Sequence, residues 1–194
     1  MPPSAPPGPP GFPGSVPVLV SGSTGGVGSV AVGVLSSLGY EVHAITSKAD
    51  EEEFLLKMGA SKVLLKDDYM KEPTKPLDKG LYGGAVDVVG GDMLAKIISM
   101  ISNHGVVSCC GNVGGASFSS SVFPFILRGI QLSGIDSAES SLSLKKELWE
   151  LLANDWSIEL EDQTKIISID AIDNEITKII NGNQVGRVVI KHGE

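Results

Sequence analysis

The feature that most constrains the fold is a glycine-rich turn between a short apolar run and an amphipathic segment. Residues 17–21 suit a strand buried on both faces, and they lead directly into the turn 22–28, GSTGGVG. Beyond the turn, apolar residues recur on one face of a predicted helix that Gly39 would end, namely Val27, Ala31, Val34, Leu35 and Leu38. A glycine turn at such a junction presents backbone N–H groups at a helix N-terminus, which favours a bound phosphate.

Strands and helices alternate along the rest of the chain. After the first strand, the pattern predicts strands at 41–46, 62–65, 85–89, 106–110 and 129–135. Helices are predicted at 51–58, with Asp50 as its cap, and around the apolar stripe Leu94, Ile97, Ile98 and Ile101, whereas 66–84 is predicted to be a polar loop. This alternation predicts an α/β fold, a Rossmann-type doubly wound parallel sheet.

The end of the chain is less regular. A leucine stripe at 144–152 predicts one more helix, and 165–169, 172–180 and 186–191 predict a strand, a helix and a strand. At the other end, eight of the eleven prolines lie within residues 1–17, which predicts a Pro-rich disordered tail.

Charge and cysteine content exclude several classes of partner. The net charge is −8 and no stretch concentrates Lys and Arg, so we expect no nucleic acid or anionic membrane surface as partner. No apolar run reaches the length of a membrane span, and the N-terminus does not resemble a signal peptide. Cys109 and Cys110 are adjacent in a predicted buried strand, which encodes neither a disulfide framework nor a metal site. We therefore expect a soluble, cytoplasmic protein.

The glycine turn matches a dinucleotide-binding template imperfectly. Against G-x-G-x-x-G, the register places Ser23, Gly25 and Gly28, so the first glycine is replaced by another small residue. A purely structural turn is the alternative. The position after the first strand and before an amphipathic helix favours dinucleotide binding.

The end of the second strand indicates which dinucleotide. NAD-binding folds usually place Asp or Glu there, whereas this chain has Thr46, Ser47 and Lys48, with Lys66 after the third strand. Hydroxyl and ammonium groups suit a 2′-phosphate, which a carboxylate would repel. The predicted cofactor is NADPH, and the alternative is that Lys48 and Lys66 are ordinary solvated lysines.

Several longer strings resemble one family. The segments VLVSGSTGGVGSVAVGVLSSLGYEV, MGASKVL, GAVDVVGG, CCGNVGG and above all FPFILRGIQLSGIDS are similar to the medium-chain dehydrogenase/reductase superfamily, in its zinc-independent quinone-oxidoreductase-like branch that includes acrylyl-CoA reductases. The resemblance extends from Val18 to the GRVVIK ending. It implies hydride transfer from NADPH to an activated C=C bond or a quinone, and a homodimer through the 129–135 strand.

The resemblance also assigns site residues. It implies that Thr24, Gly25, Gly26 and Val27 hold the pyrophosphate and that Thr46, Ser47, Lys48 and Lys66 hold the 2′-phosphate. Asn112, Ile126 and Ser137 would border the nicotinamide. No catalytic residue and no metal ligand is assigned within this chain.

The departure from the family lies at the beginning of the chain. Family members start with a large, partly β-barrel domain that builds most of the substrate cleft, and here residues 1–17 stand in its place. We divide the remainder into an NADPH-binding Rossmann domain at 18–137 and a C-terminal segment at 138–194, which in the family returns to the missing domain.

Two hypotheses about function remain open. The first is an NADPH-dependent enoyl or quinone reductase acting on a small molecule that the sequence does not identify. The second is a non-catalytic NADPH-binding module, or a truncated fragment, acting as a sensor or regulatory subunit. A hydrolase is disfavoured, because His43, His104 and His192 form no pattern with a serine or carboxylate and no G-x-S-x-G motif is present.

Overall fold

The computed structural model describes residues 16–192, so most of the predicted tail at 1–17 lies outside the described residues. Six parallel strands form one sheet in the order β3-β2-β1-β4-β5-β6. Their bounds are β1 Val18–Val20, β2 Val42–Thr46, β3 Lys62–Leu65, β4 Tyr82–Asp87, β5 Ile101–Cys109 and β6 Gln131–Gly134. This arrangement confirms the predicted Rossmann-type α/β fold.

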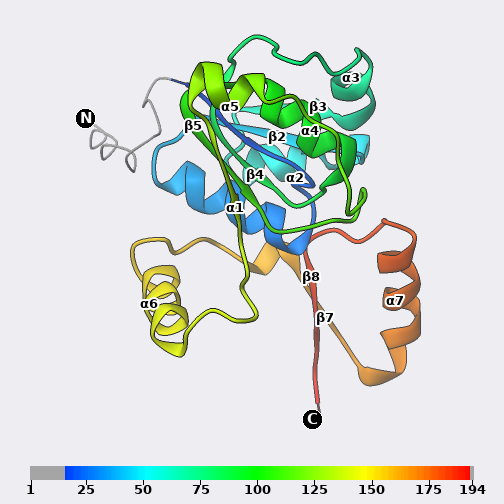
Figure 1. Ribbon diagram of the computed structural model, residues 1–194. Coiled ribbons are helices and arrows are strands. Elements are labelled where there is room, and N and C mark those ends of the chain that lie inside the picture. The colour runs from blue at the N-terminus through cyan, green and yellow to red at the C-terminus, as the bar shows by residue number, and fades with distance from the viewer. Residues whose placement is uncertain (1–15, 193–194) are drawn as a thin grey trace.

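Helices cover both faces of this sheet (Figure 1). Side chains from α1 and α2 belong to one apolar cluster with Val20 and Ala44, while α3, α4 and α5 contribute to the other with Leu19 and Ile45. Neighbouring residues of one strand thus point to opposite faces, as the strand period requires. The helices are α1 Gly26–Ser37, η1 Ala49–Glu51, α2 Glu52–Lys57, α3 Lys66–Met70, α4 Gly91–Ser99 and α5 Phe123–Arg128.

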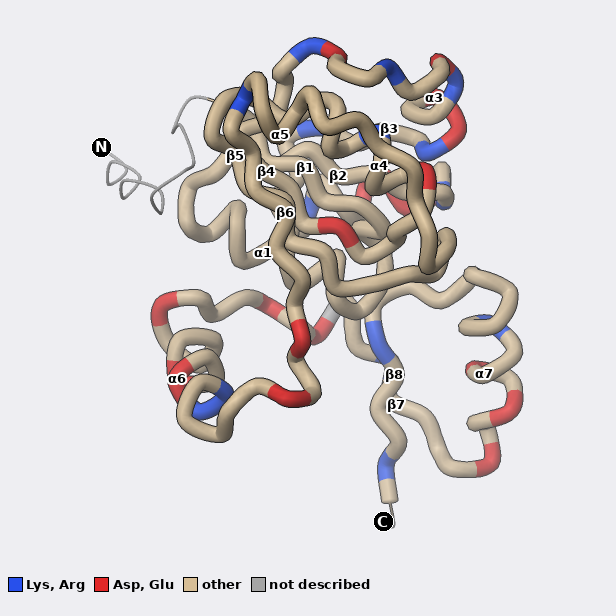
Figure 2. The backbone as a smooth tube through the Cα atoms, viewed as in Figure 1, with Lys and Arg blue, Asp and Glu red and all other residues tan. Residues whose placement is uncertain are grey.

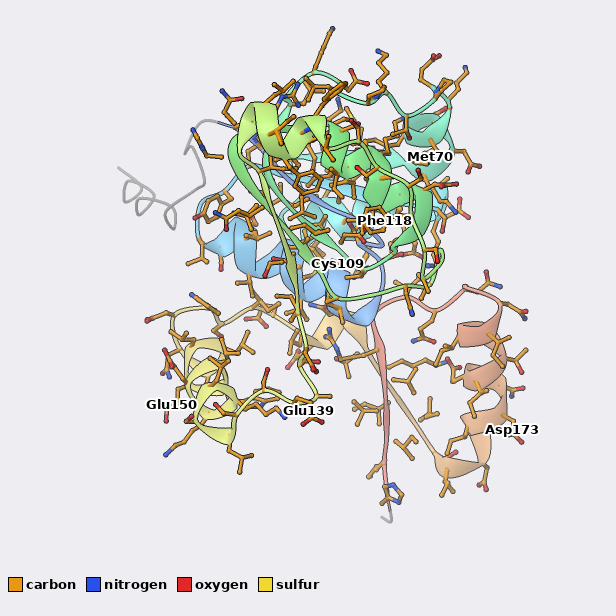
Figure 3. The ribbon with its side chains drawn as sticks, in the orientation of Figure 1. Met70, Cys109, Phe118, Glu139, Glu150 and Asp173 are labelled. Atoms are coloured by element: carbon orange, nitrogen blue, oxygen red, sulfur yellow. The ribbon has the colours of Figure 1, made fainter. Side chains whose placement is uncertain are left out.

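The chain after β6 lies apart from the sheet. Figure 1 shows α6 and α7 on opposite sides of a narrow ribbon, β7 and β8, that extends away below α1. Figure 3 places Glu150 on α6 and Asp173 on α7, both far from Cys109 in the sheet. The bounds are α6 Leu142–Ala153, η2 Glu161–Gln163, β7 Thr164–Ile167, η3 Ile169–Ala171, α7 Ile172–Ile180 and β8 Arg187–Ile190, with β7 and β8 paired in parallel.

The structure corrects the predicted loop at 66–84 and the fourth strand. Residues 66–70 form α3, whose first turn carries Asp67 and Asp68 at the positive end of the helix. The strand β4 begins at Tyr82 and ends at Asp87 instead of spanning 85–89. It ends there because the Asp87 carboxylate accepts the N–H groups of Val89 (3.3 Å) and Gly90 (2.8 Å), which turns the chain.

The fifth strand is longer than predicted. Ile101 pairs with Tyr82 at the start of β5 rather than extending the preceding helix, and the register shifts before Val106 pairs with Gly84. His104, at a φ of 61°, lies in that irregular stretch. The prediction of a buried cysteine pair is wrong, since Cys109 ends β5 half-buried and Cys110 is exposed beyond it.

Two details of the predicted helices were wrong. Val27 is 59% exposed and Val32 lies in the core, whereas Ala31 and Leu35 of the predicted apolar face do pack against that core. Asp50 lies inside η1, and the N-cap of α2 is Glu51, without a side-chain cap bond. The predicted 129–135 strand shortens to β6, because Gly129 adopts the left-handed conformation that ends α5.

Charge is spread over the described surface. In the view of Figure 2, Lys and Arg are scattered among acidic residues rather than gathered on one face. Between residues 16 and 192, no helix has both the length and the apolar character needed to cross a bilayer.

Candidate functional site

The glycine loop lies where the chain changes direction in the sheet. After β1 the chain builds β2 and β3 on one side, and β4 to β6 then follow on the other side of β1. Ligands of open α/β sheets bind outside the carboxyl ends of the strands at such a point. The glycine loop, residues 22–28, follows β1 and includes the first residues of α1. It therefore occupies the position where this fold class forms its binding crevice.

Two glycines allow the loop to pack closely. Gly22 has a φ of 57°, and a Cβ there would lie 2.6 Å from Cγ2 of Val88. A Cβ on Gly28 would overlap with the Gly22 carbonyl. Gly28 thus lets α1 approach the end of β1, the role of the third glycine in the dinucleotide template.

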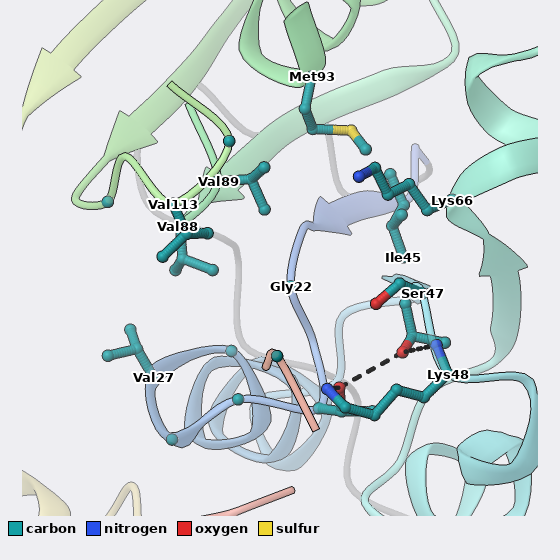
Figure 4. A pocket seen from close by; sticks show the side chains of 18 of the residues that line it. Gly22, Val27, Ile45, Ser47, Lys48, Lys66, Val88, Val89, Met93 and Val113 are labelled. Atoms are coloured by element: carbon teal, nitrogen blue, oxygen red, sulfur yellow. Dashed lines mark hydrogen bonds between the residues drawn. The ribbon is translucent and has the colours of Figure 1, made fainter. Parts of the chain in front are cut away.

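The first turn of α1 offers unsatisfied amides. Gly25 is the N-cap and has no side chain to accept a bond from the helix. Because the first N–H groups of a helix have no acceptor within it, those of Gly26, Val27 and Gly28 are available. All three residues line a pocket of about 700 Å³ at this helix end, within the size range of ligand sites (Figure 4).

A polar wall of the pocket joins the glycine loop to the end of β2. The Lys48 ammonium donates to Oγ1 of Thr24 at 3.1 Å, and the Lys48 backbone N–H donates to Oγ1 of Thr46 at 3.0 Å (Figure 4). The two threonine hydroxyls lie 3.3 Å apart. Burial lowers the pKa of Lys48 below its ordinary value, while the charge of Glu51 opposes the shift. Ser47 and Lys66, which are exposed, complete this end of the pocket.

A buried carboxylate fixes the opposite wall. Asp87, fully buried at the end of β4, accepts a 2.6 Å bond from the Ser21 hydroxyl. The Ser21 hydroxyl in turn accepts the N–H of Val88 at 3.0 Å. With the bonds to Val89 and Gly90, this network holds the turn that places Val88 and Val89 in the pocket.

A second hollow continues the site beyond β5. It has a volume of about 600 Å³ and shares Cys110 and Gly111 with the first pocket. Asn112, Ile135 and Asp136 lie on its walls. Partial burial of the sulfur, with the charges of Asp87 and Cys109 adding to it, raises the pKa of the Cys110 thiol and so favours its protonated form.

The structure gathers most of the predicted site residues. Lining the first pocket are Thr24, Gly25, Gly26, Val27, Gly28, Thr46, Ser47, Lys48 and Lys66. Asn112 lines the second. Ser23 is buried behind the loop, where its hydroxyl donates to the Val20 carbonyl at 2.8 Å. Ile126, on α5, and Ser137, beyond β6, are exposed and line neither pocket.

Sequence reasoning missed two sets of lining residues. One set follows β4 and β5: Val88, Val89, Met93, Cys110, Gly111, Val113 and Gly114. Its signal was the pair of glycine clusters at 90–91 and 111–115, each directly after a strand. The other set is Ile179, Ile180 and Gly182, at the end of α7. No local pattern marks these three, because they line the pocket from a part of the chain that is distant in sequence from the loop.

No metal site is apparent among residues 16–192, where no three His, Cys, Asp or Glu side chains gather as ligands would. The free cysteines in the described chain are Cys109 and Cys110.

Comparison with known proteins identifies related chains. Residues 26–154 match the family described as zinc-binding dehydrogenase. Acrylyl-CoA reductase AcuI of Ruegeria pomeroyi is 36% identical over 179 residues, which are 92% of this chain and 54% of that protein. The chain thus spans about half the length of the curated relatives it matches.

Two solved structures extend the comparison. YhdH of Escherichia coli K-12, crystallised with bound NADPH, is 35% identical with a TM-score of 0.86, covering 93% of this chain and 56% of that one. The Bacillus subtilis protein YhfP, with NAD bound, is 36% identical with a TM-score of 0.86, covering 93% and 55%.

Proposed function

Because this chain belongs to the medium-chain dehydrogenase/reductase superfamily, through the family described as zinc-binding dehydrogenase, we propose that it binds NADPH in the pocket at the N-terminus of α1. The observation that supports this most is the joining, in one pocket, of free helix amides with Lys48 and Lys66. The relatives crystallised with NADPH and with NAD agree with a nicotinamide dinucleotide.

The residues present fit such a cofactor. The amides of Gly26, Val27 and Gly28 suit a pyrophosphate, since backbone N–H groups and the helix dipole both favour an anion. Thr46, Ser47, Lys48 and Lys66 supply hydroxyl and ammonium groups for a 2′-phosphate. From the family resemblance, we assign the nicotinamide end to the second hollow, near Asn112, with Ile126 and Ser137 at its border. We propose that Ser23 contributes to the cofactor site by supporting the loop from behind. We also propose that the NADPH-binding domain spans residues 18–137 and that the C-terminal segment spans residues 138–194.

We infer an oxidoreductase reaction of the enoyl or quinone reductase type. When bound, NADPH would supply the hydride that reduces the substrate. The chain itself supplies binding and orientation: Asp87 and Ser21 fix the apolar wall, and Cys110 and Asn112 on the second hollow would border the cofactor's reactive end. The substrate is a small activated alkene, such as an enoyl thioester, or a quinone. A non-catalytic NADPH-binding module is the alternative, and we place either in the reducing cytoplasm, where free cysteines persist.

We further propose that two copies pair through β6. This strand is at the edge of the sheet, and Gln131, Ser133 and Gly134 on it are exposed. Unpaired edges favour strand addition, and homodimers with two-fold symmetry are the commonest assemblies. Sedimentation velocity at micromolar concentration should give the mass of a dimer. A monomer at every concentration tested would contradict the pairing.

Calorimetric titration with NADPH and with NADH tests the cofactor assignment. We expect NADPH to bind at least about tenfold more tightly, ~1.4 kcal/mol, because lysines face the 2′-phosphate. Lys48→Ala should remove most of that preference. Lys62→Ala, which removes a lysine from β3 outside the pocket, is the matched control and should retain it. Equal affinity for both cofactors, or an unchanged preference in Lys48→Ala, would contradict the assignment.

The pH dependence gives an independent check. A bound 2′-phosphate favours the charged form of Lys48, so binding takes up a proton when the free lysine is neutral. Because burial lowers the pKa of Lys48 below 10.5, the preference for NADPH should weaken as pH rises toward that value.

A turnover assay separates the two proposed functions. NADPH oxidation in the presence of acryloyl-CoA would support the enzyme, and NADPH binding without turnover would support the non-catalytic module.

A further inference from the structure

The end of the chain is bonded to the glycine loop. The Gly186 N–H donates to the Thr24 carbonyl at 2.8 Å, immediately before β8. The Arg187 guanidinium, through Nη2, donates to the Gly26 carbonyl at 2.9 Å, 161 residues away in sequence. The last strand therefore begins by bonding two carbonyls of the loop whose amides line the pocket.

Glycine is required for this approach. Gly186 has a φ of 60°, and a Cβ there would overlap with the backbone of Gln163. A Cβ on Gly26 would lie 3.5 Å from the Gly186 carbonyl oxygen, an ordinary contact. The start of β8 is thus held between η2 and the loop, with little freedom to shift.

The same segment contributes to the pocket itself. Ile179, Ile180 and Gly182, from the end of α7 and the turn before β8, line the same pocket as Gly26. Arg187 Nη1 is buried and has no hydrogen-bond partner among the described residues. Arg187 does not line the pocket, but its bond to Gly26 brings the positive charge of the guanidinium to the first turn of α1, where an anion is favoured.

The two bonded carbonyls matter for an anionic ligand. Within one peptide unit the N–H and C=O groups point in opposite directions. A loop that turns its carbonyl groups toward a phosphate therefore repels it, and one that turns its N–H groups toward the phosphate attracts it. Bonds from Gly186 and Arg187 direct the carbonyls of Thr24 and Gly26 toward β8. This leaves the amide side of the loop for the ligand.

We propose that Arg187 is a positioning residue, which fixes the glycine loop in the orientation that receives the pyrophosphate of the dinucleotide. The proposal rests on the proposed function for its ligand. Arg187 acts through the loop backbone and not on the reacting atoms, so its removal weakens pyrophosphate binding while leaving the 2′-phosphate subsite at Lys48 intact.

The test compares three ligands on the full chain. NADPH and 2′-phospho-ADP-ribose contain the pyrophosphate, whereas adenosine 2′-monophosphate contains only the 2′-phosphate end. In Arg187→Gln, affinity for the first two should fall about tenfold or more, the size of one lost charge-assisted hydrogen bond. Affinity for adenosine 2′-monophosphate should stay within about twofold, the usual scatter at sites without shared partners. Lys191→Gln, which removes an exposed positive charge just after β8, is the control and should bind all three as wild type.

Two further measurements keep the test decisive. Arg187→Lys retains a cationic donor and should recover a large part of the lost affinity. Hydrogen exchange of the Gly186 and Ser29 amides, which are bonded to the carbonyls of Thr24 and Gly25, needs no ligand, and it should accelerate in Arg187→Gln. Equal losses for all three ligands, or pyrophosphate affinity and exchange both unchanged, would overturn the proposal. Failure of the wild type to bind NADPH would instead contradict the proposed function, and the exchange result would still decide the positioning role.

Discussion

The sheet region and the C-terminal region of this chain differ sharply in packing. In β1, Val18, Leu19 and Val20 are at most 1% exposed, and α4 is buried along nearly its whole length. By contrast, α6 has no buried residue, and Leu142 and Trp149 on it are 84% and 71% exposed. Both regions have helices with apolar stripes. The comparison shows that an apolar stripe predicts a helix but not what the helix packs against.

The C-terminal region is attached at a few defined points. Ile158 packs so near α1 that a Cβ on Gly33 would lie 3.0 Å from its Cδ1 atom. The Gln163 side chain donates to the sulfur of Met58 at 3.4 Å. The bonds from Gly186 and Arg187 complete the attachment at the glycine loop. These points place the end of α7 at the pocket while leaving much apolar surface of α6 and α7 exposed.

The largest expected effect separates the two regions by stability. Leu19→Ala should lower the free energy of unfolding by about 2–5 kcal/mol, because the side chain is fully buried and leaves a cavity. Trp149→Ala should change it by less than about 0.5 kcal/mol, as expected for an exposed position. Urea unfolding followed by circular dichroism measures both. Comparable losses would show that α6 belongs to the same cooperative core as the sheet.

A smaller effect concerns the attachment of β8. Gly186→Ala should cost more than about 1–2 kcal/mol, since it combines a left-handed φ with overlap on the Gln163 backbone. Gly182 also has a positive φ but nothing within 4 Å, so Gly182→Ala should cost only that strain. Limited proteolysis should cleave within 160–192 faster in the first variant. Equal cleavage in the two variants would mean that β8 is not held by this junction.

Much of the fold was predictable because its signals are local. The first five strands of the sheet each carry a short apolar run, and Gly25 and Gly28 mark the turn after the first one. The ends of β4 and β5 were misplaced because long-range contacts set them. Asp87 ends β4 through side-chain bonds to backbone, and Ile101 joins β5 by pairing with Tyr82. The spacing of apolar residues along the sequence reveals neither of these two interactions.

The candidate site divides in the same way. Thr24, Thr46 and Lys48 could be predicted together, because consecutive strand ends of a parallel sheet meet at one edge. Ile179, Ile180 and Arg187 could not, because they reach the loop only through the course of α7 and β8. The pocket residues that could not be predicted therefore come from the C-terminal region, whose packing is the hardest to predict from the sequence.

The most direct test of a joint NADPH site is to map NADPH binding by amide chemical shifts in the ¹⁵N-labelled chain. We expect saturable shifts in three segments together: the loop 22–28, residues 46–48, and residues 179–187 of the C-terminal region. Titration with NADH should move the first and third segments and leave 46–48 nearly unchanged. No saturable shift in the loop, or shifts that spare 179–187 entirely, would contradict the claim that the two regions jointly form one NADPH site.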